Sequence, residues 1–437
     1  MPIEAHTAAA AAPTRPALRL NYQRLVNAIF ALFIFCGAIA FVEPSPYDFV
    51  SLIAMPMWFV GGFRVHRGVI PFVVLIILYN VAGFISLVPY WNEPDPRAFM
   101  LQSLYLAITA IFFVIFFNER TEERIALCLK AFAASTVFGA LTGIIGYFDI
   151  AGTGEIFATY GRSAGTFKDP NVFGSYLILG ALYLLQAVML SRGKSLVLVF
   201  LLFLIDILGI FLSFSRGSEG AFLIAVTTMV GLTFITTQQR SMRRRIVVGT
   251  LCAIVAGVLI LVAILSVDSI RELFLQRLQA PGEEYDDPRF FNQLHSLPLL
   301  LDRPNGFGPL RFRLWFFLEP HSSYVNAFAS YGWLGGFVFL TMVAATTFVG
   351  FRLTLTRSPF QTPALVVWPA LMIFFLQGFQ IDIDHWRHVY LMLGMVWGLE
   401  AARLRWSQGR RAPAVANATA RQPASAHTPA ISFSRKM

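Results

Sequence analysis

The segment SLVLVFLLFLIDILGIFLS, residues 195–213, decides the fold, because Asp206 is its only charged residue. Coiled as an α-helix with a rise of 1.5 Å per residue, it is about 28 Å long, which matches the hydrocarbon core of a bilayer. Across all 437 residues, 57% are hydrophobic and 13% are charged, whereas soluble domains carry about 25% charged residues. Similar apolar blocks recur along the chain, without the strict alternation of barrel strands. We therefore predict an all-α polytopic membrane protein.

The apolar blocks and the positive charges predict both the spans and their orientation. The twelve predicted spans cover residues 25–42, 47–63, 69–88, 98–117, 125–148, 171–190, 195–213, 217–236, 246–266, 325–350, 363–380 and 386–403. With the N-terminus in the cytoplasm, the inner segments hold most of the 34 Lys and Arg residues, including Arg240 and the run 243–245. Cytoplasmic loops of membrane proteins carry such an excess. We expect both termini in the cytoplasm.

This pattern divides the chain into five parts. They are a disordered cytoplasmic tail over 1–24, nine helices over 25–266, a large outer loop over 267–324, three helices over 325–403 and a second disordered tail over 404–437. The net charge of +10 is explained by the cytoplasmic loops, so we expect no nucleic-acid partner. The cysteines Cys36, Cys128 and Cys252 lie in apolar blocks, which indicates buried thiols rather than disulfides or metal ligands. We expect no cofactor.

The stretch GRSAGTFKDPN, residues 161–171, places charged residues on a short outer connection. Asp169 and Pro170 are typical of a helix start, with Asp169 as the N-cap and Pro170 in the first turn. Arg162 and Lys168 are open to two interpretations. They either extend past the membrane edge at a capped helix start, or they bind an anionic group such as phosphate. Asn171 is a secondary candidate beside them.

A second outer connection, SFSRGSEG over 213–220, holds Arg216 next to the start of a span. An arginine at that depth is costly unless it has a partner. Arg216 either pairs with Glu219 or binds phosphate oxygens through its guanidinium fork. Ser215 is a secondary candidate. Asp206 is also open to two interpretations, as a functional intramembrane acid or as a hydrogen-bond acceptor for Ser or Thr on a neighbouring helix.

The loop over 267–324 is long enough to carry a function. It opens with an amphipathic helix signature, in which Val267, Ile270, Phe274 and Leu278 share one face. It ends at His321, which directly precedes a span and has Tyr324 nearby. A neutral His suits proton transfer near pH 7, although a single loop His is more often a surface residue.

The last outer loop, IDIDHWRH over 381–388, carries Asp382 and Asp384 close to two histidines. Their spacing allows a metal site, but it allows ion pairs with the outer arginines equally well. We favour the ion pairs and predict no metal site.

In their order, spacing and side of the membrane, these loops resemble the O-antigen ligase/polymerase family of bacterial membrane glycosyltransferases. The matching pieces are GRSAGTFKDPNVFGSYL, SFSRGSEGAFL, DPRFFNQLHSLPLLLDRPNGFG and PHSSYVNAFASYGWLGG, which together cover roughly residues 160–350. The sequence departs from many relatives in having Ser322 where they have Asn after the histidine, which concerns how the acceptor is positioned.

The resemblance implies a GT-C-like fold in the bacterial inner membrane and an inverting, metal-independent sugar transfer on the outer face. The implied donor is a glycan on undecaprenyl pyrophosphate. The implied pyrophosphate ligands are Arg162, Arg216 and Arg289, with Lys168 beside them, and His321 is the implied base or orienting group for the acceptor hydroxyl.

The sequence leaves four functions open. We favour a polymerase that joins lipid-linked repeat units of an exopolysaccharide, capsule or O-antigen. A ligase that moves the finished glycan to lipid A core or another acceptor shares the same donor site. A third possibility is a transporter of lipid-linked sugars, and a fourth is a non-catalytic subunit of the assembly machinery. Neither of these needs His321 for catalysis. The expected partners are the lipid-linked donor, a glycan or lipid acceptor, the bilayer, a flippase and a chain-length regulator.

Overall fold

The computed structural model describes residues 17–268, 271–272, 275 and 283–420. The α-helices are α1 (Ala17–Phe35), α2 (Pro46–Val60), α3 (Ile70–Leu87), α4 (Pro94–Asn118), α5 (Thr121–Tyr147), α6 (Gly154–Phe157), α7 (Pro170–Leu190), α8 (Lys194–Leu212), α9 (Arg216–Thr236), α10 (Arg240–Leu265), α12 (Glu283–Leu301), α13 (Phe312–Phe316), α14 (Ser323–Leu355), α15 (Gln361–Gln377) and α16 (Arg387–Ala420). A two-residue hairpin pairs β1 (Ala158–Thr159) with β2 (Arg162–Ser163), and short 3₁₀ turns cover 36–38, 67–69, 88–90 and 150–152.

The helices form a membrane-protein bundle, as predicted. Among the described residues, eight helices are long and apolar enough to cross a membrane, judged by length and composition. Three shorter apolar helices cover 22–38, 46–60 and 361–377, and α16 covers the last predicted span. Each predicted span therefore lies on a helix, whereas the number of membrane crossings stays a prediction.

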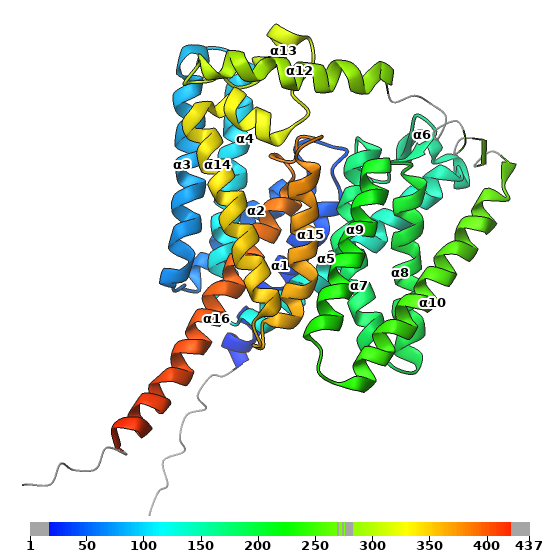
Figure 1. The fold of residues 1–437 in the computed structure, drawn as a ribbon, viewed down its shortest axis with the longest axis vertical. Helices are drawn as coiled ribbons and strands as arrows, with labels where there is room; N and C mark the ends of the chain where they lie inside the picture. The colour runs from blue at the N-terminus through cyan, green and yellow to red at the C-terminus, as the bar shows by residue number, and fades with distance from the viewer. Residues whose placement is uncertain (1–16, 269–270, 273–274, 276–282, 421–437) are drawn as a thin grey trace, which may run out of the picture.

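The bundle has two distinct ends (Figure 1). α12 and α13 lie across one end, where α6 also lies, and we call this the loop end. The first turns of α1 and the C-terminal part of α16 lie at the opposite end. The connections that we predicted to face outward lie at the loop end or contact it, as described below. This arrangement is compatible with one functional face.

Three parts of the chain are more helical than we predicted. α1 begins at Ala17, inside the predicted tail over 1–24, and α16 continues to Ala420, inside the predicted tail over 404–437. Alanine and arginine, which are strong helix formers, continue both helices beyond the apolar block. The predicted loop over 267–324 contains α12 and α13. The amphipathic signature over 267–278 lies mostly outside the described residues.

Small residues allow α16 and α4 to pack closely. A Cβ atom on Gly394 would lie 2.4 Å from the Cβ of Phe113, and one on Gly398 would lie 2.5 Å from the Cβ of Phe117. The spacing of four places both glycines on one face of α16. Helices in a membrane associate through such close van der Waals packing, because lipid offers no hydrophobic drive between them.

Asp206 links two helices within the bundle. It is fully buried in α8, and its Oδ2 accepts a hydrogen bond of 2.9 Å from Thr136 Oγ1 of α5. The hydrogen bond to a threonine on a neighbouring helix, one of the two interpretations above, is therefore present. It gives Asp206 a packing role at the α5–α8 contact.

A break in α14 anchors the segment that crosses the loop end. Gly332 has φ +68° and ψ −173°, so the helix is interrupted there. The interruption leaves the carbonyl of Ala329 to accept from the backbone N–H groups of Phe307 and Gly308, and Trp333 N–H donates to the carbonyl of Pro304. The DRPNGFG sequence is thus bound to α14 by its own backbone.

Candidate functional site

Arg162 lies at the centre of a buried polar cluster. Its side chain is 9% exposed, and it donates from Nε to the carbonyl of Ser213 and from Nη2 to Oδ1 of Asn171, both at 2.8 Å. Glu219 lies within electrostatic reach of the same guanidinium. Arg162 therefore joins the 161–171 connection to the connection between α8 and α9.

The start of α7 is as predicted from the sequence. Asp169 caps the helix by accepting from the backbone N–H groups of Asn171 and Val172, and Pro170 is the first helical residue. Asn171 and Ser215 are also part of the local framework. The hydroxyl of Ser218 donates to the carbonyl of Asn171, and Ser215, as N-cap of α9, accepts from the backbone N–H of Ser218.

Arg216 differs from Arg162 in its surroundings. It is the first residue of α9 and is exposed. Within the described part of the chain, its side chain makes no hydrogen bond or ion pair, so the predicted alternative of a pair with Glu219 is not present there. A cation held at a helix start, without a fixed partner among those residues, is accessible to an anionic ligand.

The backbone at His321 is unusual and is held by α12. His321 has φ +45°, in the left-handed region that non-glycine residues seldom adopt. Gln293 of α12 donates from Nε2 to the carbonyl of Pro320 at 2.8 Å and to that of His321 at 3.3 Å. Strained backbone of this kind persists where the surroundings fix it, and it occurs often at functional sites.

The charged residues of the last connection separate into different surroundings. Asp382 Oδ2 lies 3.8 Å from Nδ1 of His321, and both side chains are close to 30% exposed, at 28% and 29%. Asp384 is buried and accepts from Asn326 Nδ2 at 2.8 Å. His385 pairs with this second aspartate, its Nδ1 lying 3.3 Å from Oδ2 of Asp384, and its ring lies against that of Phe99. Within the described residues no group of three or more His, Cys, Asp or Glu side chains is arranged to hold a metal ion.

Glu319, two residues before His321, has a carboxyl group with a raised pKa. Burial raises the pKa of its carboxyl above the usual 4.5, and Arg313, with Nη1 at 3.7 Å, opposes that rise. The nearby carboxylate of Asp384 raises the pKa further. The approach to His321 therefore contains two acids, Glu319 and Asp382, in partly buried positions.

The C-terminal end of α15 connects the arginine cluster with the His321 segment. Gln377 Nε2 lies 3.2 Å from both the hydroxyl of Ser175 in α7 and the carbonyl of Gly217 in α9. The next carbonyl, that of Gly378, accepts from the backbone N–H of Ser323 at 2.8 Å. The starts of α7, α9 and α14 are thus bound to one another through two consecutive residues.

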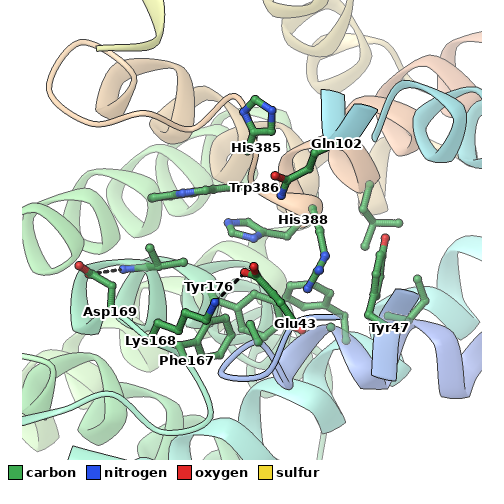
Figure 2. Close-up of a pocket in the computed structure, with 17 residues that line it drawn as sticks. Glu43, Tyr47, Gln102, Phe167, Lys168, Asp169, Tyr176, His385, Trp386 and His388 are labelled. Atoms are coloured by element: carbon green, nitrogen blue, oxygen red, sulfur yellow. Dashed lines mark hydrogen bonds and ion pairs between the residues drawn. The ribbon is translucent and has the colours of Figure 1, made fainter. Parts of the chain in front are cut away.

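Lys168 faces a different part of the loop end. Its Nζ lies 2.9 Å from a carboxylate oxygen of Glu43, and both side chains are more than half exposed. Together they line a cavity of about 210 Å³, with Tyr47 on α2, Tyr176 on α7 and His388 on α16 (Figure 2). Neither Arg162, Arg216 nor His321 lines this cavity.

For two predicted site residues, Tyr324 and Arg289, the structure does not describe a side chain that is free to bind a ligand. Tyr324 donates its hydroxyl to the carbonyl of Phe375 and stacks on Phe379, so it packs α14 against α15. Arg289 lies in α12, but its side chain is outside the described residues.

Several residues of the site were not predicted from the sequence. Gln293 and Gln377 act through contacts with other segments of the chain, and Glu319 through Arg313, and no local pattern marks any of the three. Tyr47 belongs to an apolar span, where it resembles an ordinary core residue, and His388 was considered only as a possible metal ligand. The Glu219 position was considered only as a partner of Arg216.

No protein-family model matches the sequence, and no curated protein is significantly similar to it.

Proposed function

We propose that this protein is a membrane glycosyltransferase of the O-antigen ligase/polymerase type, which polymerises lipid-linked repeat units of an exopolysaccharide, capsule or O-antigen. In this proposal the twelve helices cross the bacterial inner membrane with both termini in the cytoplasm. The loop end then faces outward and carries the segment over 267–324. The donor is a glycan on undecaprenyl pyrophosphate, and a flippase and a chain-length regulator are the expected partners.

The observation that carries the proposal is the pairing of His321 with Asp382 at 3.8 Å, at the same end as the arginines. This distance is longer than a hydrogen bond, yet the carboxylate stabilises positive charge on the imidazole ring. With Nδ1 facing Asp382, Nε2 of His321 takes the proton of the acceptor hydroxyl. The acceptor oxygen then bonds to the anomeric carbon of the donor sugar.

The bond from that carbon to the pyrophosphate oxygen breaks in the same step, and its electrons go to the leaving pyrophosphate. Arg216, exposed at the start of α9, is placed to bind the pyrophosphate directly. Arg162, which is buried, supplies fixed positive charge in this proposal and holds the connection in shape through Ser213 and Asn171. Fixed charge of this kind stabilises a developing anion without reorganisation, and the activated donor supplies the energy.

The experiment is to incubate purified, detergent-solubilised protein with a lipid-linked repeat unit and to determine product lengths by mass spectrometry. We expect a ladder of longer lipid-linked glycans from the wild type. His321→Ala and Arg216→Ala should each lower the rate by about 10²–10³-fold, as loss of a general base or of a charge-stabilising group does. His295→Ala is the matched control, because His295 is an exposed histidine of α12 that stacks on Phe291.

Each alternative has its own result. No elongation, but transfer to a separate lipid A core acceptor, would replace the polymerase with a ligase. An untouched donor in both mixtures would contradict glycosyl transfer, and lipid-linked sugar translocation in vesicles would then establish a transporter. Equal activity of the wild type and of His321→Ala would contradict the assigned role of the histidine.

A further inference from the structure

The cavity beside Lys168 has a composition that points to a particular ligand. It lies between α1, α2, α4, α5, α7 and α16, and the connections over 36–45 and 164–169 also line it. Its volume of about 210 Å³ is below the range of about 300–1,000 Å³ that drug-sized ligands occupy. It therefore suits one small ring rather than a chain of several.

Two enclosed polar groups of its wall lack partners. Tyr47 and His388 are 3% and 6% exposed, and Tyr47 Oη and His388 Nε2 make no hydrogen bond with any described residue. A buried polar atom without a partner costs about 1–3 kcal/mol. Such atoms are uncommon in folded proteins, and a ligand or water that supplies the missing bond is the usual reason for them.

The orientation of His388 is set by three neighbouring rings. Its imidazole lies 5.0 Å from the ring of Phe374, and 5.3 Å from those of Trp386 and Tyr176, measured between centroids. Figure 2 shows His388 in the interior of the group, between Trp386 and the Glu43–Lys168 pair. The ring is therefore held in place without a hydrogen bond, so its nitrogen atoms are preorganised for a ligand.

The charges around the cavity are already balanced. Lys168 pairs with Glu43 at 2.9 Å, and Arg387 pairs with Asp48 at the same distance. The start of α7, which would otherwise attract an anion, is occupied by the carboxylate of Asp169. A phosphate group would have to break one of these ion pairs, whereas a neutral ligand with several hydroxyl groups can donate to the carboxylates and accept from the cations.

Aromatic side chains complete the wall. Trp386, Phe167 and Phe132 line the cavity together with Tyr176, which offers mainly its ring because its hydroxyl is 2.7 Å from that of Ser135. The C–H faces of a sugar ring pack on aromatic rings while its hydroxyl groups reach polar atoms at the edge. Apolar walls with a few fixed polar groups are the general pattern of small-molecule sites.

We propose that this cavity binds a single neutral sugar ring, which, on the function proposed above, is the terminal residue of the acceptor glycan. The segment over 381–388 supports that placement. It carries Asp382 at His321 and, a few residues later, Arg387 and His388 at the cavity. The two places are thus joined by one short connection.

The test measures sugar binding directly, with no transfer reaction. Purified full-length protein in detergent is mixed with the methyl glycosides of glucose, galactose, mannose, rhamnose and N-acetylglucosamine, and bound sugar is detected by saturation-transfer-difference NMR. We expect at least one glycoside to bind, and Tyr47→Phe to weaken that binding by about tenfold, because one hydrogen bond to an enclosed hydroxyl is lost. Trp386→Leu should weaken it as well, through loss of ring contact.

Tyr183→Phe is the matched control, since it removes a hydroxyl from α7 outside the cavity, and its sugar binding should equal that of the wild type. Tyr47→Phe removes a hydroxyl without a partner, so its thermal stability should equal or exceed that of the wild type. No binding by any glycoside, unchanged binding in Tyr47→Phe, or displacement of the sugar by inorganic pyrophosphate would overturn the proposal. Sugar binding in a protein that transfers nothing would instead contradict the transferase function and leave the cavity assignment standing.

Discussion

Arg162 and Arg216 are equivalent in the family resemblance, yet their surroundings predict very different losses of stability when each is replaced by alanine. Arg162→Ala removes two charge-assisted hydrogen bonds, to Ser213 and Asn171, and it leaves Glu219 without its neighbouring cation. Removing one member of a buried charged cluster costs about 3–5 kcal/mol. Arg216→Ala removes an exposed side chain, and such changes are usually within about 0.5 kcal/mol.

A double variant separates the charge effect from the lost hydrogen bonds. Glu219→Gln introduced together with Arg162→Ala removes the uncompensated carboxylate, so we expect it to recover about 1–2 kcal/mol of the loss. The free energy of unfolding is measured by titration with sodium dodecyl sulfate and followed by circular dichroism. Arg162→Lys is informative beside it, because a lysine retains the charge but does not reproduce the guanidinium fork.

Two results would refute this reasoning. One is an equal loss of stability in Arg162→Ala and Arg216→Ala, because burial would then not distinguish the arginines. The other is a double variant that is no more stable than Arg162→Ala, because Glu219 would then not depend on the cation. In the transfer assay both single variants should be strongly impaired, but only Arg162→Ala should also be unstable.

Three further predictions concern the framework and the surroundings of His321. Gly332→Ala should lower the free energy of unfolding by about 2–4 kcal/mol, measured by the same titration. Both the positive φ of residue 332 and the carbonyl of Pro304, 2.6 Å from the added Cβ, disfavour a side chain there. Unchanged stability would contradict the break in α14. Asp206→Asn should preserve both folding and sugar transfer, because the amide retains an acceptor for Thr136, whereas complete loss of function in a stable variant would favour a coupled transporter. Burial raises the pKa of Glu319, so its contribution to stability is fully present below about pH 4.5 and is lost as pH rises through the higher folded-state pKa. Glu319→Gln should remove that fall, and identical pH–stability curves for the two proteins would contradict it.

Much of the bundle was predictable because a membrane helix is marked in the sequence by a continuous block of apolar residues. Each apolar block of the sequence coincides with a helix, and the Asp169–Pro170 pair marked the start of α7 correctly. Local composition failed where the helix continues beyond the membrane signal. α16 extends to Ala420 because its polar continuation is still rich in helix formers.

The site was predictable only in part, because its geometry depends on contacts between distant segments. The sequence marked Arg162 and His321 as candidates, but it did not indicate that Gln293 holds the backbone at His321 from α12. It placed Lys168 among the phosphate ligands, whereas the structure places it with Glu43 at the cavity. No spacing rule connects residues on separate elements, such as Lys168 and Glu43, so such pairings are visible only in three dimensions.

On the proposed function, a base and a set of cations from different segments must act on one bond, and α15 is the helix that ties those segments together. Displacement at an anomeric carbon requires the attacking and leaving oxygens on opposite sides, so the base and the pyrophosphate ligands must be held at a fixed separation. Gln377 binds the first part of α7, which Arg162 contacts through Asn171, and the start of α9, which carries Arg216. Gly378 binds the start of α14, which follows His321. Gln377→Leu should therefore reduce transfer more than it reduces donor binding, since the ligands remain present while their spacing relaxes. A rise in the KM for the donor at unchanged kcat would show that α15 serves binding alone.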